Sequence, residues 1–451
     1  MSSSSASGDP PAGPGRVPFD LGAPDFLDPG ALDREARRIF DICHGCRLCL
    51  SFCPSFPALF DAIDGHEERG EGEVAALTQP EIDRVVDLCY QCKLCFVNCP
   101  YTPPHEWAVD FPRVVLRAKA VRAKQHGVTR QDRFLGDPDR LGRLASHLPG
   151  VMNWANRQGA LRQAMQRAVG VDHRRNLPPF VRPTFADWAT KHRGPAPAAE
   201  AVDPARAVVL YGTCLGNYNY PDINLAALQV LEAAGKQVVH LYPRCCGMPM
   251  LDGGDIDGAV RNARENVRAI APYVRRGVPV VVPQPTCGYV FKQELPFLVP
   301  DDDGRRVAGA TLDLLEYVDR LLATGALKKE FPGPGPGRVA YHLPCHLKAQ
   351  NIGTRSAAVL RQIPGAEVQV IDKCSAFDGT WGMKQEYFDL SIKYASKLVR
   401  GVTEAAPQTV CSDCSLAGLN VEYGTGHRPV HPIQVLRDAL GLVPPFRWNA
   451  R

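Results

Sequence analysis

Two cysteine runs near the N-terminus constrain the fold of this chain more than any other feature. The second run begins 46 residues after the first, and both read C-x2-C-x2-C-x3-C-P. A single run of this kind can arise by chance in a cysteine-rich chain, whereas two copies, each followed by proline, do not arise readily. The runs consist of Cys43, Cys46, Cys49, Cys53 and Pro54, and of Cys89, Cys92, Cys95, Cys99 and Pro100.

This spacing is typical of bacterial iron–sulfur ligation and predicts two [4Fe–4S] clusters. Three closely spaced thiolates wrap around one cluster, and in two-cluster ferredoxins the fourth cysteine of each run binds the other cluster. Zinc sites use two C-x2-C pairs or mix in histidine, so zinc fits the runs poorly. The predicted ligand sets are Cys43, Cys46, Cys49 and Cys99 for cluster 1, and Cys89, Cys92, Cys95 and Cys53 for cluster 2.

Composition excludes several other classes of protein. The chain has 451 residues and a net charge of +4, which suits several globular domains and argues against nucleic-acid binding. The N-terminus lacks a basic segment followed by an apolar one, and no apolar run reaches the about 18–20 residues that span a bilayer. The 16 cysteines occur in motif spacings, not in a secreted framework. We therefore expect a cytoplasmic protein that meets the inner membrane only peripherally.

The N-terminal half is predicted to contain three segments. Residues 1–30 are rich in Ser, Pro, Gly and Ala, which favours disorder. Residues 31–125 are predicted to form a helical ferredoxin domain, because the stretch between the cysteine runs has helical texture and Thr78 precedes Glu81 as in a capping box. Residues 126–204 are predicted to form a helical connector and linker.

The connector belongs to a basic stretch. Residues 113–175 hold 14 Lys or Arg and 4 Asp or Glu. Two interpretations stay open at this stage: a solvated helical face, or a surface that docks onto an acidic partner or a membrane.

The C-terminal half reads as two α/β domains, residues 205–330 and 331–445. Short apolar runs alternate with helical stretches in each, which favours parallel sheets covered by helices. The predicted strands are 207–212, 237–241 and 278–282 in the first domain, and 338–341 and 367–371 in the second.

The remaining eight cysteines follow these strands in two matching sets. Cys214 matches Cys345 at an offset of 131 residues, Cys245 matches Cys374 at 129, and Cys287 matches Cys414 at 127. Such offsets indicate an internal duplication. Each half then gathers cysteines at the carboxyl ends of strands, where open α/β sheets place ligands. The two sets are Cys214, Cys245, Cys246 and Cys287, and Cys345, Cys374, Cys411 and Cys414.

Here the chain resembles a known family. Cys245-Cys246-Gly247, the stretch from Cys374 to Gly382, and Cys411-Ser412-Asp413-Cys414 followed by His431-Pro432 are similar to cysteine-rich CCG domains. Two ferredoxin runs followed by two CCG domains resemble the heterodisulfide reductase-related iron–sulfur proteins. That family includes the C subunit of anaerobic glycerol-3-phosphate dehydrogenase and the iron–sulfur subunit of glycolate oxidase.

The resemblance implies an α-helical ferredoxin domain followed by duplicated α/β CCG domains. It also implies one or two further iron–sulfur clusters, held by the two C-terminal cysteine sets. The sequence departs from the family pattern at Gln284, which stands opposite Cys411 in the duplication, and at Ser375, which replaces the second cysteine of CCG. Each half therefore keeps four cysteines, which suffice for a cubane but not for a five-thiolate cluster. An alternative interpretation is that one or both halves have lost their cluster and keep their cysteines as buried or redox-active thiols.

These features predict an electron-transfer subunit of a multisubunit oxidoreductase. No G-x-G-x-x-G motif follows a predicted strand, so hydride chemistry needs a partner. The expected partners are a flavoprotein dehydrogenase or other redox protein and an acceptor such as quinone. His342 and His346 flank Cys345 and could donate to a cluster, carry protons, or only close a turn. The alternatives are a thiol–disulfide reductase of the heterodisulfide reductase type and an electron donor to another redox protein.

Overall fold

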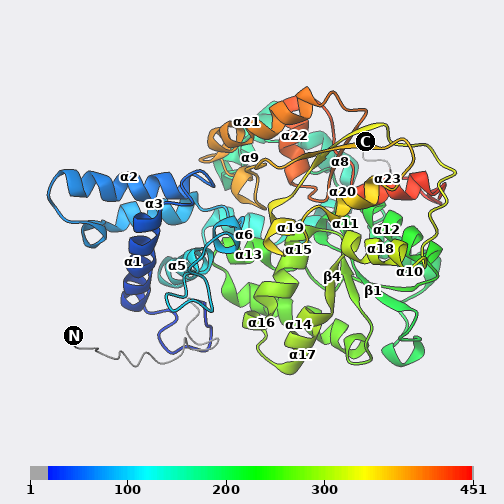
Figure 1. Cartoon of the computed structure of the whole chain (residues 1–451), viewed down its shortest axis with the longest axis horizontal. Helices are drawn as coiled ribbons and strands as arrows, with labels where there is room; N and C mark the ends of the chain where they lie inside the picture. Colours follow the sequence, from blue (N-terminus) through cyan, green and yellow to red (C-terminus); the bar gives the residue numbers. More distant parts are fainter. Residues whose placement is uncertain (1–18, 449–451) are drawn as a thin grey trace, which may run out of the picture. The chain divides into compact units, whose positions relative to one another are not determined.

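The computed structural model describes residues 19–448, and these divide into two compact units (Figure 1). The first unit consists of residues 19–128 together with Asp252–Gly254. The second unit consists of Thr129–Leu251 and the described residues from Asp255 onward, so the basic connector and both CCG halves share one unit.

The first unit is helical, and residues 19–128 contain no strand. Asp28 caps the first helix by accepting from the backbone N–H of Ala31 at 2.6 Å. The capping box is confirmed, since the carboxylate of Glu81 accepts from both the backbone N–H and the hydroxyl of Thr78. The helices are α1 (Pro29–Cys46), α2 (Ser55–Glu68), α3 (Gln79–Leu88), α4 (Leu94–Val97) and α5 (Phe111–His126).

The segment before α1 differs from the prediction of disorder wherever the structure describes it. Residues 1–18 lie outside the described residues. Phe19 and Phe26 are buried and pack edge to face. The guanidinium of Arg117 donates to the carbonyl oxygens of Asp25 and Phe26 at 2.6 and 2.8 Å. Two aromatic side chains and one buried arginine thus order a segment whose composition alone favours disorder.

The connector supplies the first helices of the second unit. Thr129, Asp137 and Thr184 cap three of them through their side-chain oxygens, which accept backbone N–H groups. The helices are α6 (Arg130–Gly136), α7 (Pro138–Ala145), α8 (Pro149–Ala155), α9 (Gly159–Val169) and α10 (Phe185–Arg193).

Two small parallel sheets form the centre of the second unit. The first has the strand order β2-β1-β3-β4 and the second β6-β5-β7. All five predicted strands are confirmed, whereas β4 and β7 were not predicted. The strands are β1 (Ala207–Tyr211), β2 (Gln237–Leu241), β3 (Val280–Val282), β4 (Thr311–Asp313), β5 (Arg338–His342), β6 (Glu367–Ile371) and β7 (Thr409–Ser412).

Helices cover these sheets. In the first half they are α11 (Cys214–Tyr218), α12 (Pro221–Ala233), α13 (Met248–Asp252), α14 (Ile256–Val274), α15 (Pro285–Tyr289), α16 (Leu295–Leu298), α17 (Asp302–Ala310) and α18 (Leu314–Ala323). In the second half they are α19 (Cys345–Ala349), α20 (Arg355–Leu360), α21 (Phe388–Glu404), α22 (Ala417–Thr425) and α23 (Pro432–Ala439).

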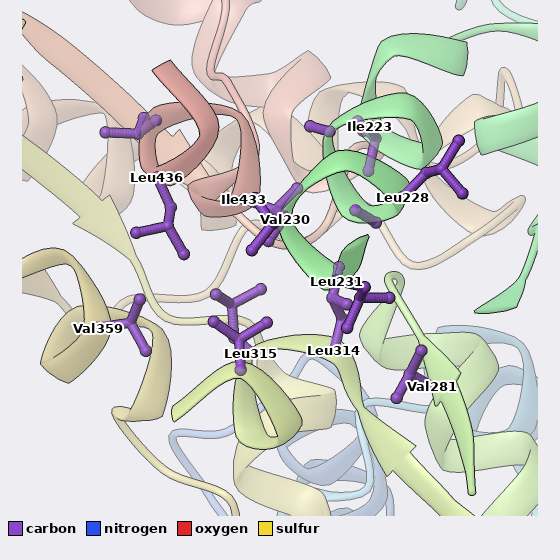
Figure 2. Close-up of a cluster of buried hydrophobic side chains, with 14 of the residues drawn as sticks. Ile223, Leu228, Val230, Leu231, Val281, Leu314, Leu315, Val359, Ile433 and Leu436 are labelled. Carbon is purple, nitrogen blue, oxygen red and sulfur yellow. The ribbon is translucent and has the colours of Figure 1, made fainter. Parts of the chain in front are cut away.

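The two CCG halves share one hydrophobic core. Figure 2 shows Val230 of α12 beside Ile433 of α23, and Leu231 of α12 beside Leu314 of α18, in one cluster. Burying aliphatic side chains from both halves in one cluster stabilises the two sheets as a single body. The duplicated domains seen in the sequence are therefore not independent packing units.

Candidate iron–sulfur and cysteine site

The first cysteine quartet forms around a small cavity in the first unit. Cys43, Cys46, Cys49 and Cys99 line it together with apolar side chains that include Phe56 and Val109. Burial and the charges of Cys49, Cys99 and Cys46 raise the pKa of Cys43. The same causes, with Cys99 and Cys46 as neighbours, raise the pKa of Cys49 to about 12. The structure thus brings together the four residues predicted for cluster 1.

The second quartet combines three cysteines of the second run with Cys53 of the first. Burial, followed by the charges of Cys89 and Cys92, raises the pKa of Cys53 well above its usual value. Burial also raises the pKa of Cys95, with contributions from Cys92, Cys89, Cys53 and then Cys49. The last contribution shows that the two quartets lie within electrostatic reach of each other.

Burying four thiolates in an apolar pocket is unfavourable, their mutual repulsion adds to this cost, and the raised pKa values express both. A cationic iron–sulfur core removes that cost, because metal coordination deprotonates thiols outright. The backbone N–H of Tyr101 donates to the sulfur of Cys99 at 3.4 Å, which further suits a bound thiolate. The donor set and its environment therefore fit the predicted clusters.

Sequence reasoning missed two buried polar residues within the second run. Gln91 and Lys93 are 1 % and 2 % exposed. The ammonium of Lys93 donates to the side-chain carbonyl of Gln91 at 2.7 Å, and the amide of Gln91 donates to the sulfur of Cys89 at 3.5 Å. Both residues have positive φ, as does Arg47 of the first run, so the loops between cysteines adopt the left-handed conformation. Nothing in residue type alone signals a lysine buried within a cysteine run.

The first CCG set forms a connected group of thiols. Hydrogen bonds link Cys214 to Cys245, Cys245 to Cys246 and Cys246 to Cys287. Thiol donation from Cys245 and Cys287 lowers the pKa of Cys246 well below its usual value. The structure brings all four predicted residues together, and the lowered pKa of Cys246 favours its thiolate, the form in which cysteine binds metal or attacks disulfides.

Several side chains fix the loop that carries Cys245 and Cys246. Asp139 of α7 accepts from the backbone N–H of Cys245 at 2.7 Å, and Asn262 and Asn266 donate to the carbonyl of Cys245 at 3.3 Å. Gly247 has a φ of +96°, which side-chain-bearing residues rarely adopt. Asp139 lies in the connector, 106 residues from Cys245, so sequence spacing gives no signal for it.

The second set is characterised by the positions of its cysteines in the fold and by their contacts with neighbouring groups. Cys345 begins α19, and the sulfur of Cys374 accepts from the backbone N–H of Ala376 at 3.2 Å. Burial raises the pKa of Cys414 to about 11, with smaller contributions from Asp378 and Asp413. The charge of Cys414 contributes in turn to the raised pKa of Cys287. A thiol of the second half therefore lies within electrostatic reach of the first set.

Cys411 lies apart from the set in which it was predicted. It is 0 % exposed and belongs to the hydrophobic core with Val339 and Tyr341. Burial raises its pKa, and the only charge that contributes is that of Asp413. The side chain of Cys411 thus packs as a small apolar group, and we leave it out of the proposed ligands.

The strand register explains this placement. Leu210 pairs with Val281 in the first sheet, and Tyr341 pairs with Cys411 in the second. Because Leu210 and Tyr341 share the offset of 131 residues that relates Cys214 to Cys345, the counterpart of Cys411 is the core residue Val281. The cysteine spacing predicts Gln284 as the counterpart of Cys411, but the strand register places that counterpart three residues earlier, at Val281.

Gln284 has a structural role between the two halves. Its amide donates to the hydroxyl of Ser415 at 2.8 Å and accepts from the backbone N–H of Ser415 at 3.2 Å. Ser375 accepts through its carbonyl from the amide of Asn420 at 2.6 Å. Both departures from the family pattern therefore occupy hydrogen-bonded positions.

The histidines near Cys345 also have partners. His342 is hydrogen-bonded to the hydroxyl of Ser412 at 2.9 Å, and burial lowers its pKa to about 4, so it is neutral near pH 7. His346 is hydrogen-bonded to the hydroxyl of Thr286 at 2.8 Å and stacks on Tyr289. Of the roles considered for His342, these contacts favour a structural one.

Comparison with known proteins identifies the domains. Residues 36–127 match the Citrate utilization protein B Fer4-like domain, and residues 208–292 and 339–421 match the Cysteine-rich domain, CCG. The C subunit of the anaerobic glycerol-3-phosphate dehydrogenase of Escherichia coli K12 is 31 % identical over 312 residues, covering 68 % of this chain and 76 % of that protein. The chain belongs to this family of iron–sulfur proteins.

Two more distant relatives each match about half of the chain. The B subunit of the fumarate reductase (CoM/CoB) of Methanothermobacter marburgensis is 27 % identical over 48 % of this chain and 42 % of that protein. The lactate utilization protein A of an Exiguobacterium strain is 23 % identical over 51 % of this chain and 95 % of that protein.

Membership of the family settles the general role. The chain is an iron–sulfur electron-transfer subunit of an oxidoreductase, and two of the relatives named above are subunits of a dehydrogenase and of a reductase. Within residues 19–448, no helix combines the length and the apolar character that crossing a bilayer requires.

Proposed function

We propose that the chain relays electrons one at a time through two [4Fe–4S] clusters in the first unit and one further cluster in the first CCG half. The observation that carries this proposal is the pair of crossed quartets, in which Cys99 joins the first run and Cys53 joins the second. A [4Fe–4S] cluster, when bound, accepts and releases single electrons.

The protein residues hold and insulate these sites. Cys43, Cys46, Cys49 and Cys99 would bind one cluster, and Cys89, Cys92, Cys95 and Cys53 the other. Phe56 and Val109 exclude water from the first quartet. The buried Lys93 donates to Gln91, whose amide donates to the sulfur of Cys89, and hydrogen bonds to ligand sulfurs tune the potential of a cluster there.

The first CCG half would hold a third cluster through Cys214, Cys245, Cys246 and Cys287. The close approach of their sulfurs and the lowered pKa of Cys246 support this assignment. Cys345, Cys374 and Cys414 offer only three thiols in the second half, so we propose no fourth cubane there. Cys414 lies within electrostatic reach of Cys287, so a cluster in the first half would lie near this thiol of the second.

We propose a flavoprotein dehydrogenase or another redox protein as the partner that supplies the electrons. The sequence carries no dinucleotide-binding motif, so a two-electron oxidation of a metabolite needs another chain. A lipid-soluble acceptor such as quinone would take the electrons from the other end of the relay. Isolated, the chain is expected to transfer electrons to dyes but not to oxidise glycerol-3-phosphate or a 2-hydroxy acid.

A second candidate function is thiol–disulfide reduction at the first CCG half. The low pKa of Cys246 between two thiol donors favours it, because thiolates attack disulfides. Two electrons from the relay and two protons would convert one disulfide into two thiols. Disulfide-dependent oxidation of a reduced dye, lost in Cys246→Ser, would support this candidate over the simple relay.

We also propose peripheral attachment on the cytoplasmic face of the inner membrane. Residues 140–171 contain no acidic residue but include the exposed Arg140, Arg143 and Arg167. Five exposed apolar side chains lie in the same segment, a combination that suits an anionic bilayer. They are Leu144 (63 % exposed), Leu148 (65 %), Val151 (57 %), Trp154 (56 %) and Leu161 (44 %).

Vesicle binding tests this attachment. The chain should co-sediment with vesicles that contain phosphatidylglycerol and less with pure phosphatidylcholine. Leu148→Ser with Trp154→Ser should abolish binding, whereas Val443→Ser, which removes an exposed apolar side chain elsewhere, should not. Equal binding by all variants would contradict the proposal.

Anaerobic iron and acid-labile sulfide analysis, with an electron paramagnetic resonance spectrum of the reduced protein, tests the relay itself. We expect about twelve irons per chain, four for each of three clusters. About eight irons would confine the clusters to the first unit. Cys99→Ser should remove one ferredoxin signal and Cys53→Ser the other, and loss of the same signal in both variants would contradict the crossed ligation.

A further inference from the structure

A basic cavity lies beside the second CCG half, within the second unit. It has a volume of about 580 Å³ and is lined by residues 153–179 of the connector together with α22 and Arg428. A second cavity of about 670 Å³ shares Tyr220, Leu419, Glu422 and Arg428 with it and reaches Cys414. We call the first of these the basic cavity.

Two of its arginines are buried without a carboxylate bound to them. Arg162 is 3 % exposed and donates to the carbonyl oxygens of Asp172 and Arg175 at 2.7 and 2.8 Å, while its Nη1 has no partner. Arg175 is 2 % exposed, and its Nε likewise has no partner. Its other nitrogens donate to the neutral groups of Asn420 and Ser391.

The nearest acidic side chain is already engaged. Asp172 accepts from the guanidinium of Arg174 at 2.9 and 3.1 Å and from its backbone N–H at 2.8 Å. Burial lowers the pKa of Arg162, and it lowers the pKa of Arg175 to about 10, although the charge of Asp172 opposes both shifts. Burying a positive charge without a paired anion is unfavourable. Arg162 and Arg175 therefore leave an uncompensated positive charge beside the basic cavity, and a bound anion would balance it.

The entrance to the cavity is basic as well. Arg157 and Arg428 are exposed and line it, and Arg157 donates through Nε to the carbonyl of Asn153 at 3.1 Å, which leaves its Nη atoms for other partners. Arg428 lies over the ring of Tyr220 at 5.0 Å. Glu422 is the one acidic residue among the lining side chains, against five arginines.

We propose that the basic cavity binds a small oxyanion, either a phosphate group or a carboxylate. Arg157 and Arg428 would contact it at the entrance, and the buried positive charges of Arg162 and Arg175 behind them would attract it. Planar guanidinium groups bind both oxyanions through paired N–H donors. Because the adjoining cavity reaches Cys414, a larger anionic molecule held here could extend to the cysteines of the CCG halves.

Thermal unfolding of the cluster-loaded chain tests the proposal. Inorganic phosphate and malonate are compared at equal ionic strength with sodium chloride, and calorimetry gives the dissociation constant of whichever ion raises the unfolding temperature. Phosphate alone would identify a phosphate site and malonate alone a carboxylate site. No rise beyond that given by chloride would overturn the proposal.

Variants locate the bound ion. Arg157→Gln and Arg428→Gln, both at exposed positions, should each weaken binding by about tenfold or more, because each removes a charge-assisted hydrogen bond. Arg167→Gln is the matched control, since Arg167 is exposed on the same helix as Arg162 but does not line the cavity. Iron content is measured for each variant. Binding unchanged in both cavity variants, or lost equally in the control, would contradict the site.

Discussion

The two CCG halves have the same strand framework but different cysteine chemistry. In both, a central strand pairs in parallel with neighbours on each side, and a cysteine follows that strand to begin a helix. The first half assembles all four of its cysteines around Cys246. The second half buries Cys411 in the core, and the sulfurs of Cys374 and Cys414 accept from backbone N–H groups.

This difference shows that a duplicated fold need not duplicate its site. Strand register is fixed by packing, so Cys411 and its counterpart Val281 both face the core. The loops after the strands are free to diverge, and they decide how many thiols meet. The halves also differ at their edges, since β4 extends the first sheet and has no equivalent in the second.

The largest expected effect comes from removing Cys246 of the first half. Cys246→Ser should lower the iron content by about four per chain, because it removes the sulfur to which both Cys245 and Cys287 donate. Iron and sulfide analysis measures this loss. Cys411→Val should leave the iron content unchanged, and equal losses in the two variants would break the proposed contrast between the halves.

A buried carboxylate where the two halves meet should make stability depend on pH. Burial and the charge of Asp413 raise the pKa of Asp313 from 3.8 to about 7. Between these values the folded state holds a proton that the unfolded state has lost, so stability falls as the pH rises from about 4 to about 7 and then levels off. Asp313→Asn should remove this fall and stabilise the protein by about 1–3 kcal/mol at pH 8.

Urea unfolding at pH 5 and pH 8 checks the expected shift. Asparagine keeps the ability of Asp313 to cap α18, where its Oδ1 accepts from the backbone N–H groups of Leu315 and Glu316. Asp301→Asn is the matched control, because Asp301 also caps a helix but is exposed. A pH slope that persists in Asp313→Asn would assign the effect to other groups.

A smaller effect on stability is expected at Cys411 of the second half, whose side chain lies in the hydrophobic core. Cys411→Ser should destabilise the protein by about 1–2 kcal/mol, because it buries a hydroxyl among apolar side chains. Cys411→Val preserves an apolar group and should cost less. Urea unfolding compares the two, and loss of iron from either variant would return Cys411 to the ligand set.

The smallest effect is expected at the contact between Gln284 and Ser415. Gln284→Ala removes two hydrogen bonds between the halves and should cost about 1 kcal/mol of unfolding free energy without changing the iron content. Ser415→Ala removes one of them and should cost less. A change in the iron content of Gln284→Ala would instead place this residue at a cluster.

Much of the fold could be predicted because its signals are local. Hydrophobic runs identified β1, β2, β3, β5 and β6, and Thr78 with Glu81 identified a helix start. The strands β4 and β7 were missed, since each is short and its sequence, Thr-Leu-Asp or Thr-Val-Cys-Ser, carries little periodicity. The ordered segment with Phe19 and Phe26 was missed because distant Arg117 holds it.

The sequence by itself determined the two ferredoxin quartets, because thiol spacing within a run and repetition of the run leave few other arrangements. Only the tertiary structure decided what surrounds them. It buried Lys93 beside the second run, brought Asp139 to Cys245 and turned Cys411 into the core. Such placements depend on contacts between residues far apart in the chain. Burial and strand register, not residue type, decide whether a cysteine can bind a metal and whether a charged side chain needs a partner.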